Sequence, residues 1–269
     1  MNMPDFDESR VIFEKRWQEY VNNFLASPSN SKVFKAYESG GILSPENRNV
    51  VEHQIMARFV VEVLCDLCGV DGNEKEDGLT AASLHDFNVL EEKFGRRNGK
   101  YKHYRDIESL KEKDRNTLRE LGFSEEAISL TDANITHEEG GPKSLTAMFL
   151  FLADACISGT KIVDIRKRFA DTRMGWRSDK KRIDDKTAQE NAYYYDHFWK
   201  GAPGHGDRPH DEVQLETAAR ICSDLVGILR EKQADTKNPK YARIFGPNGD
   251  SNLLPEYIRD KVNEKVANV

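Results

Sequence analysis

Apolar residues in this chain recur every three to four positions, and the apolar–polar alternation that is typical of strands is almost absent. Within residues 8–25, for example, Trp17 and Val21 lie on one face of a helix, which predicts an amphipathic N-terminal helix. This periodicity constrains the fold more than any other feature, because it leaves no segments for a central sheet. We therefore expect an all-α fold.

Start and stop signals divide the rest of the chain. Ser44, Pro45 and Glu46 open a predicted helix that ends at Gly69. Beyond it we expect a loop over 71–78, followed by helices over 80–94, 107–121, 124–130, 144–157 and 211–232, the last of which begins with a capping box of Asp211 and Gln214. No internal repeat or low-complexity linker is present. We expect residues 1–269 to form a single domain with further helices over 211–269.

Composition excludes several classes of protein. With 38% hydrophobic and 32% charged residues in 269, the chain is globular rather than disordered. No apolar run approaches the roughly 18 residues that span a bilayer, and the acidic N-terminus does not resemble a secretory signal. Four cysteines are too few for a disulfide framework. We therefore expect a cytoplasmic protein without membrane association, and the net charge of −6 argues against a general nucleic-acid binder.

Titratable side chains occur where the pattern predicts burial. His53 shares a helix face with Met56 and Val60, and the adjacent pair His85-Asp86 lies in an apolar frame. Asp154 is the only acid within the apolar helix 144–157. An unpaired carboxylate buried there would cost several kcal/mol or remain protonated. A divalent cation that binds all four side chains removes this difficulty, and such nitrogen and oxygen donors suit Mn, Fe, Co, Ni or Zn.

Each of these residues also has a simpler interpretation. A core histidine usually donates to a backbone carbonyl, and Asp154 could be the buried partner of an arginine. Cys65 and Cys68 have CxxC spacing, but they lie inside a helix without a second pair, so core packing is the favoured interpretation. For His205 and His210 we expect an exposed loop rather than a metal site.

The order of these residues along the chain is similar to that in a known protein family. His53, then His85-Asp86 within Ala-Ala-Ser-Leu-His-Asp, then Asp154 within Leu-Ala-Asp-Ala, resembles the HD-domain superfamily of metal-dependent phosphohydrolases over about residues 44–169. The resemblance implies an all-α helical bundle that holds one or two metal ions, Mg included, and hydrolyses phosphate esters. It assigns His53, His85, Asp86 and Asp154 as catalytic metal ligands. It also assigns to His137 a contact with a second metal or with the substrate phosphate.

The chain departs from the family in two respects. Phe87 and Asn88 follow the His-Asp pair where many members have a lysine, and Val89 stands where some branches have a glutamate. The general base therefore stays unassigned from the sequence.

A basic segment follows the helix that contains Asp154. Residues 161–186 contain ten Lys and Arg against five Asp, so the segment carries +5 in a chain of net charge −6. It is either a solvated helix face or a funnel for an anionic substrate. Phosphate contacts are expected from Arg166, Arg173 and Arg177, with Arg168 a further candidate, and from His137 and Lys143 outside the segment. Of the run 193–195, at most two tyrosines can line a pocket, because consecutive residues point in different directions.

These features predict a metal-dependent hydrolase that acts on a phosphate ester, with a nucleotide as the first substrate to test. The alternatives are a phosphodiesterase for a cyclic or oligonucleotide, which a second metal would favour, and a catalytically silent module that binds nucleotides or a partner protein. A homo-oligomer is left open.

Overall fold

The computed structural model describes the backbone of residues 6–131, 141–174, 185–202, 204–232 and 238–267, and the side chains from residue 14 onward within those ranges. Helices make up nearly all of the regular structure, which confirms the all-α prediction. In chain order they are α1 (Phe6–Ala26), α2 (Ser31–Ser39), α3 (Arg48–Cys68), α4 (Gly72–Leu84), α5 (Val89–Arg97), α6 (Glu108–Glu120), α7 (Glu125–Thr131), α8 (Leu145–Cys156), α9 (Ile165–Arg173), α10 (Asp185–Tyr193), α11 (His210–Glu231), α12 (Ala242–Phe245) and α13 (Leu254–Ala267).

Shorter elements connect these helices. Single 3-10 turns are η1 (Pro28–Asn30), η2 (Pro45–Asn47), η3 (Tyr104–Ile107), η6 (Pro239–Tyr241) and η7 (Ser251–Leu253), and η5 (Tyr194–Phe198) is a π-helical turn. The strands β1 (Ile157–Ser158) and β2 (Lys161–Ile162) form a small antiparallel hairpin, in which Ile157 pairs with Ile162. This hairpin lies between α8 and α9.

The helix predicted to begin at Ser44 is present with a different first turn. Residues Pro45–Asn47 form the 3-10 turn η2, and α3 follows from Arg48. The helix ends as expected at Gly69, whose φ of 68° is the left-handed conformation that glycine adopts without strain. His53 therefore lies in the first half of one long helix that packs in the core.

Two predictions around α4 were wrong. The expected loop over 71–78 is helical, because α4 begins at Gly72. Gly78 does not terminate a helix but allows α4 to approach α8, since a Cβ atom there would lie 3.1 Å from Thr146 Cγ2. The expected helix over 80–94 is interrupted by a turn at residues 85–88, in which the Phe87 amide donates to the Leu84 carbonyl at 3.1 Å. The His85-Asp86 pair therefore lies in a turn between two helices.

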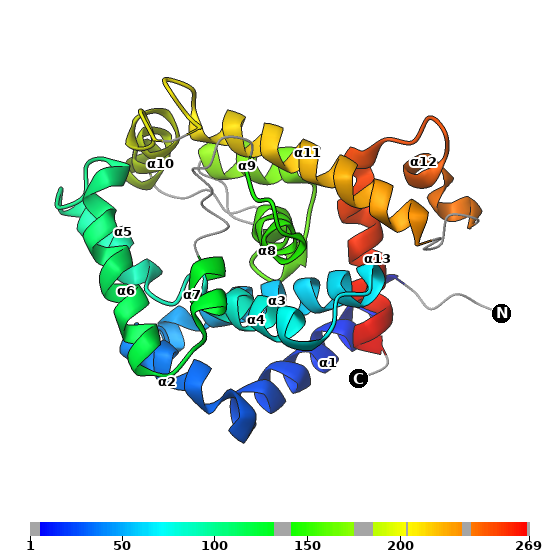
Figure 1. Cartoon of the computed structure of the whole chain (residues 1–269), viewed down its shortest axis with the longest axis horizontal. Helices are drawn as coiled ribbons and strands as arrows, with labels where there is room; N and C mark the ends of the chain where they lie inside the picture. Colours follow the sequence, from blue (N-terminus) through cyan, green and yellow to red (C-terminus); the bar gives the residue numbers. More distant parts are fainter. Residues whose placement is uncertain (1–5, 132–140, 175–184, 203, 233–237, 268–269) are drawn as a thin grey trace.

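The apolar helix predicted over 144–157 is α8, and it forms the centre of the molecule. Ser144 caps it, since its hydroxyl accepts from the Ala147 amide at 3.2 Å. In Figure 1 α8 is seen nearly end-on, with α3 and α4 below it and α9 and α11 above it. Helix α3 packs against both α4 and α8, and α4 packs against α8. These three helices bring together residues that are distant in the sequence.

The first turn of α11 differs from its prediction, and α2 is a helix that was not predicted. Helix α11 begins at His210 after Pro209, and no side chain caps it, so the predicted capping box at Asp211 was wrong. The Asp211 carboxylate instead accepts two hydrogen bonds from Arg173. Helix α2, for which the sequence analysis gave no expectation, packs against α4.

One large core cluster extends from Trp17 to Val266, and a second, mainly aromatic cluster contains Tyr101, Phe198 and Trp199.

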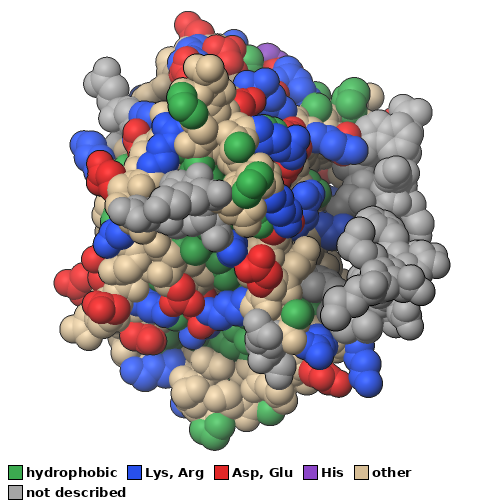
Figure 2. All heavy atoms as spheres, turned by 90° about the vertical axis from the view of Figure 1, so that its right-hand side faces the viewer, with side chains coloured by type: hydrophobic (Ala, Val, Ile, Leu, Met, Phe, Trp, Pro, Cys, Tyr) green, Lys and Arg blue, Asp and Glu red, His purple; other side chains and the backbone are tan. Residues whose placement is uncertain are grey.

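Basic and acidic side chains lie interleaved on the face that Figure 2 shows, beside α12 and α13. No helix in the described part of the chain has both the length and the apolar character to cross a membrane.

Candidate metal centre

His53, His85, Asp86 and Asp154 converge from three parts of the fold. His53 lies in α3, Asp154 in the last turn of α8, and the other two in the turn after α4. Ligand atoms of His53, His85 and Asp86 all lie within 4.8 Å of one another. Asp154 Oδ1 lies 3.2 Å from His53 Nε2 and 3.8 Å from His85 Nε2. The structure therefore brings together the four residues that the sequence analysis proposed as ligands.

The orientation of His85 shows which of its nitrogens can bind a ligand. Its Nδ1 lies 2.8 Å from the Ala82 carbonyl oxygen. A carbonyl only accepts, so Nδ1 carries the proton, and Nε2 of the neutral ring has a lone pair. This is the arrangement in which proteins commonly present a histidine to a metal.

The surroundings of that lone pair match the needs of a cation. The His85 side chain is fully buried, and its Nε2 lies 3.4 Å from His53 Nε2, 3.8 Å from Asp154 Oδ1 and 4.0 Å from Asp86 Oδ2. All three distances exceed the roughly 2.7–3.2 Å of a good hydrogen bond. Two donors that bind one ion at about 2.1 Å with a tetrahedral angle lie about 3.4 Å apart. The separation of the two imidazole nitrogens thus fits a shared metal ion.

The simpler interpretation of His53 also has a concrete geometry. His53 Nε2–H could donate to Asp154 Oδ1 across their 3.2 Å separation, without any ion. That hydrogen bond would account for His53 and Asp154 but leave the buried Nε2 of His85 with only distant neighbours. The four side chains fit either a shared cation or this hydrogen-bonded pair beside a buried imidazole.

Arg168 in α9 places a positive charge beside this cluster, with Nη2 3.4 Å from Asp154 Oδ1. Asp154 lies at the C-terminal end of α8, where the helix dipole disfavours a carboxylate. Burial alone would raise the pKa of Asp154, but the charge of Arg168 and the hydrogen bond from His53 lower it below its ordinary value. Asp154 is therefore ionised at neutral pH and available as a ligand.

A small cavity of about 60 Å³ adjoins the turn that carries His85 and Asp86. Glu92 of α5 and Lys111 of α6 also line it. Burial, together with the nearby charge of Asp86, raises the pKa of Glu92, although Arg96 opposes this shift. The cavity therefore has both a carboxyl group and a lysine side chain in its lining, next to the cluster.

The proposed phosphate contacts are not gathered here. His137 and Arg177 lie outside the described residues. Lys143 is exposed just before the first residue of α8, Leu145. Asp154 lies nine residues farther along this helix, which places it about 14 Å from Leu145 at the usual helical rise. Arg173 binds Asp211 and Asp196 rather than facing the cluster.

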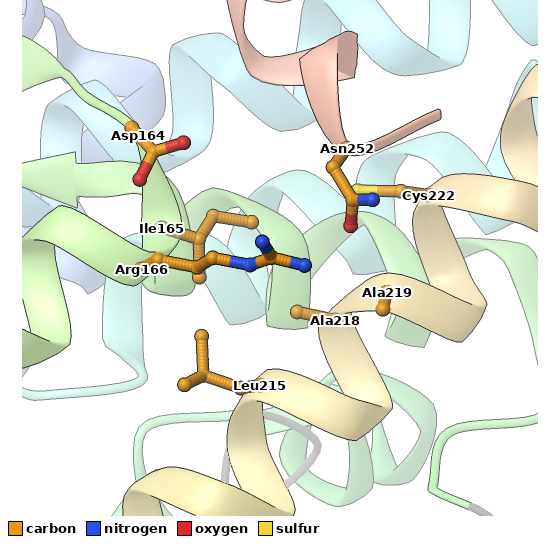
Figure 3. Close-up of a pocket in the computed structure, with 8 residues that line it drawn as sticks. All are labelled: Asp164, Ile165, Arg166, Leu215, Ala218, Ala219, Cys222 and Asn252. Carbon is orange, nitrogen blue, oxygen red and sulfur yellow. The ribbon is translucent and has the colours of Figure 1, made fainter. Parts of the chain in front are cut away.

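Arg166 points in a different direction from Arg168 on the same helix. Figure 3 shows its guanidinium between α9 and α11, beside Ala218 and Asn252. The pocket there has a volume of about 20 Å³, which admits about one water molecule. Among the described residues of the basic segment, Arg168 is thus the arginine that reaches the cluster. The sequence analysis named it only as one candidate among several, because helical spacing does not reveal which face meets α8.

The remaining candidates have structural explanations. Cys65 and Cys68 are buried, and burial raises the pKa of their thiols to about 12 and about 11, in agreement with the core-packing interpretation. The expectation of an exposed loop for His205 and His210 was wrong. Both are buried, with His205 Nε2 2.8 Å from His210 Nδ1 and both rings stacked on Trp199.

Comparison with protein-family models, curated proteins and solved structures finds no match for this chain. The geometry of the cluster and the order of its residues are therefore the features of this chain that bear on its function.

Proposed function

We propose that this chain is a metal-dependent phosphohydrolase that cleaves a phosphate ester of a nucleotide or a related small molecule. The observation that carries the proposal is the buried His85 Nε2, whose lone pair faces a second imidazole and two carboxylates at 3.4–4.0 Å. This donor set suits a borderline transition metal such as Mn, Fe, Co, Ni or Zn better than Mg, which prefers oxygen ligands.

Each residue has a defined task in this proposal. His53, His85, Asp86 and Asp154 would hold the ion, and the bond from His85 Nδ1 to Ala82 keeps Nε2 directed at it. A divalent metal bound there supplies Lewis acidity, which lowers the pKa of water and polarises a phosphoryl oxygen. Arg168, which lies beside Asp154, would bind the phosphoryl oxygens and offset their charge during the reaction.

The decisive experiment combines metal analysis with a substrate panel. The protein is stripped with a chelator, reloaded with Mn, Co, Ni, Zn or Mg, and assayed on nucleotides, cyclic nucleotides and simple phosphate esters. Metal near one equivalent together with metal-dependent phosphate release supports the proposal. Release only from cyclic or oligonucleotides would favour the phosphodiesterase. No bound metal and no turnover would overturn the hydrolase assignment.

A further inference from the structure

A second and larger cavity lies between α5 and the segment formed by α10 and η5. Its volume is about 570 Å³, which falls in the range of roughly 300–1,000 Å³ that is usual for sites that bind small ligands. None of the four proposed metal ligands lines it. The cavity is therefore separate from the candidate metal centre.

The charged lining of this cavity is mainly positive. Lys93, Arg96, Arg97 and Lys186 face it, against one carboxylate, that of Glu190. Arg97 pairs with Glu190 at 3.2 Å, and Arg96 pairs with Glu92, which lies outside the cavity lining. Lys93 and Lys186 are exposed and make no ion pair within the described ranges of the chain. Two ammonium groups on facing helices are thus available to an anion.

Aromatic side chains make up part of the remaining lining. Tyr101, Tyr194 and Phe198 line the cavity, and the Arg96 guanidinium lies 4.4 Å above the Tyr194 ring centre. At the edge, the Tyr193 side chain is 46% exposed, and its hydroxyl donates to the Lys102 carbonyl at 3.3 Å. Aromatic rings and a flat guanidinium are surfaces on which planar heterocycles stack.

We infer that this cavity binds a nucleoside phosphate, with the base against Tyr193 and the Arg96 guanidinium and the phosphate between Lys93 and Lys186. The combination of stacking surface and facing lysines selects this class, because a simple anion would not use the rings and a neutral heterocycle would not use the lysines. Gln189 and Asn191, which also line the cavity, offer amide groups to the base edge or the sugar.

The site is independent of the metal cluster. Glu92 lines the small cavity beside Asp86, whereas Arg96, one helical turn later, lines the large one. The two linings have no residue in common, and Arg96 Nε pairs with Glu92 Oε1 at 3.2 Å. A ligand in the large cavity therefore binds without touching the proposed metal ligands.

Isothermal titration calorimetry on the full chain in excess chelator tests this inference. The probes are AMP, GMP, CMP and UMP, with ribose 5-phosphate and adenosine as truncated probes. At least one mononucleotide should bind at least tenfold more tightly than either truncated probe. Failure of all four to bind, or equal binding of ribose 5-phosphate, would overturn the inference.

Substitutions then locate the binding. Tyr193→Ala should weaken binding about 5- to 100-fold through lost stacking, and Tyr193→Phe should preserve it. Joint replacement of Lys93 and Lys186 by Gln should weaken it about tenfold, and more at low salt. Two exposed residues outside the cavity serve as matched controls: Phe94→Ala on α5 and Lys35→Gln on α2 should leave binding unchanged.

The His85→Gln variant separates this inference from the proposed hydrolase. Nucleotide binding should persist in that variant, which lacks a metal ligand. Loss of binding there would place the nucleotide at the metal cluster and contradict a separate site. Persistence of binding in a protein that never takes up metal would support the cavity while the hydrolase proposal fails.

Discussion

A Cβ atom on Gly40 would lie 1.9 Å from the carbonyl oxygen of Phe87. Gly40 follows α2, and Phe87 belongs to the turn that also contains His85 and Asp86. The end of α2 therefore packs directly against the turn that carries His85 and Asp86. The two backbones are so close that only glycine, which lacks a Cβ atom, fits at position 40.

Gly40→Ala should displace this turn and impair metal binding. The φ of −78° at Gly40 suits alanine, so the clash with the Phe87 carbonyl is the main penalty. We expect a loss of about 1–3 kcal/mol in the free energy of unfolding, together with weaker metal affinity. Gly227→Ala is the control, since its Cβ meets nothing within 4 Å and it lies within α11. That change should leave the metal in place and stabilise the protein by up to about 1 kcal/mol.

His85→Gln should remove bound metal and activity together. The variant loses a buried nitrogen donor, and metal analysis by mass spectrometry measures the result directly. Loading the wild type with metal to 100 times its dissociation constant should stabilise it by about 2.7 kcal/mol, and the variant should lose most of this effect. His197→Gln, at an exposed histidine outside the cluster, is the control. Full metal content in His85→Gln would show that the site is misassigned.

Arg168→Gln should lower kcat/KM about tenfold to hundredfold while leaving metal content at neutral pH near that of the wild type. This range corresponds to the roughly 1.5–3 kcal/mol of a hydrogen bond to a charged group. Arg166→Gln, two residues away on α9, tests for general loss of charge, because that side chain points toward Asn252 instead. Equal effects of the two substitutions would contradict a specific role for Arg168.

Arg173→Gln should reduce stability rather than KM. The guanidinium donates to both carboxylate oxygens of Asp211, at 2.7 and 2.6 Å, and also pairs with Asp196. We expect a loss of about 1–2 kcal/mol, since the network is partly exposed. A double-mutant cycle with Asp211→Asn, followed by urea denaturation, should show a coupling of about 0.5 kcal/mol or more. A raised KM with unchanged stability would contradict this structural role and indicate that Arg173 contacts the substrate.

Asp66 provides a pH-dependent link between α3 and α13. Burial opposes ionisation, but bonds from Lys265 at 2.8 Å and Lys75 at 2.5 Å lower the pKa of its carboxyl. A carboxyl with a depressed folded-state pKa stabilises the fold above its unfolded value of about 3.9, and this contribution is lost as the pH falls through the folded value. Asp66→Asn should therefore cost about 1 kcal/mol or less at pH 7, given its exposure. In denaturation experiments the difference from the wild type should shrink as the pH falls below the unfolded value of about 3.9.

The sequence predicted the helices that supply His53 and Asp154, because apolar spacing and end signals agree in both. It did not predict the turn at His85, because the apolar residues of 80–94 maintain a helical pattern across the interruption. The sequence predicts a loop at Gly78, since a glycine that permits close helix packing looks the same in the sequence as one that ends a helix.

Contacts of the charged side chains were harder to predict than the helices. The partners of Arg168 and Arg173 lie 14 and 38 residues away in the sequence, and helical periodicity carries no information about such pairs. The four proposed ligands were identified because burial of a polar group must be compensated, a requirement visible in the sequence itself.

The separation of the ligands along the chain has a kinetic consequence. His53 and Asp154 are 101 residues apart, so both donors meet only after α3, α4 and α8 have packed. An ion that binds this set contributes little to the early, local steps of folding, where such distant contacts are still absent. Added metal should therefore slow unfolding and leave the refolding rate nearly unchanged, so that the ion prolongs the lifetime of the native state rather than guiding the chain toward it.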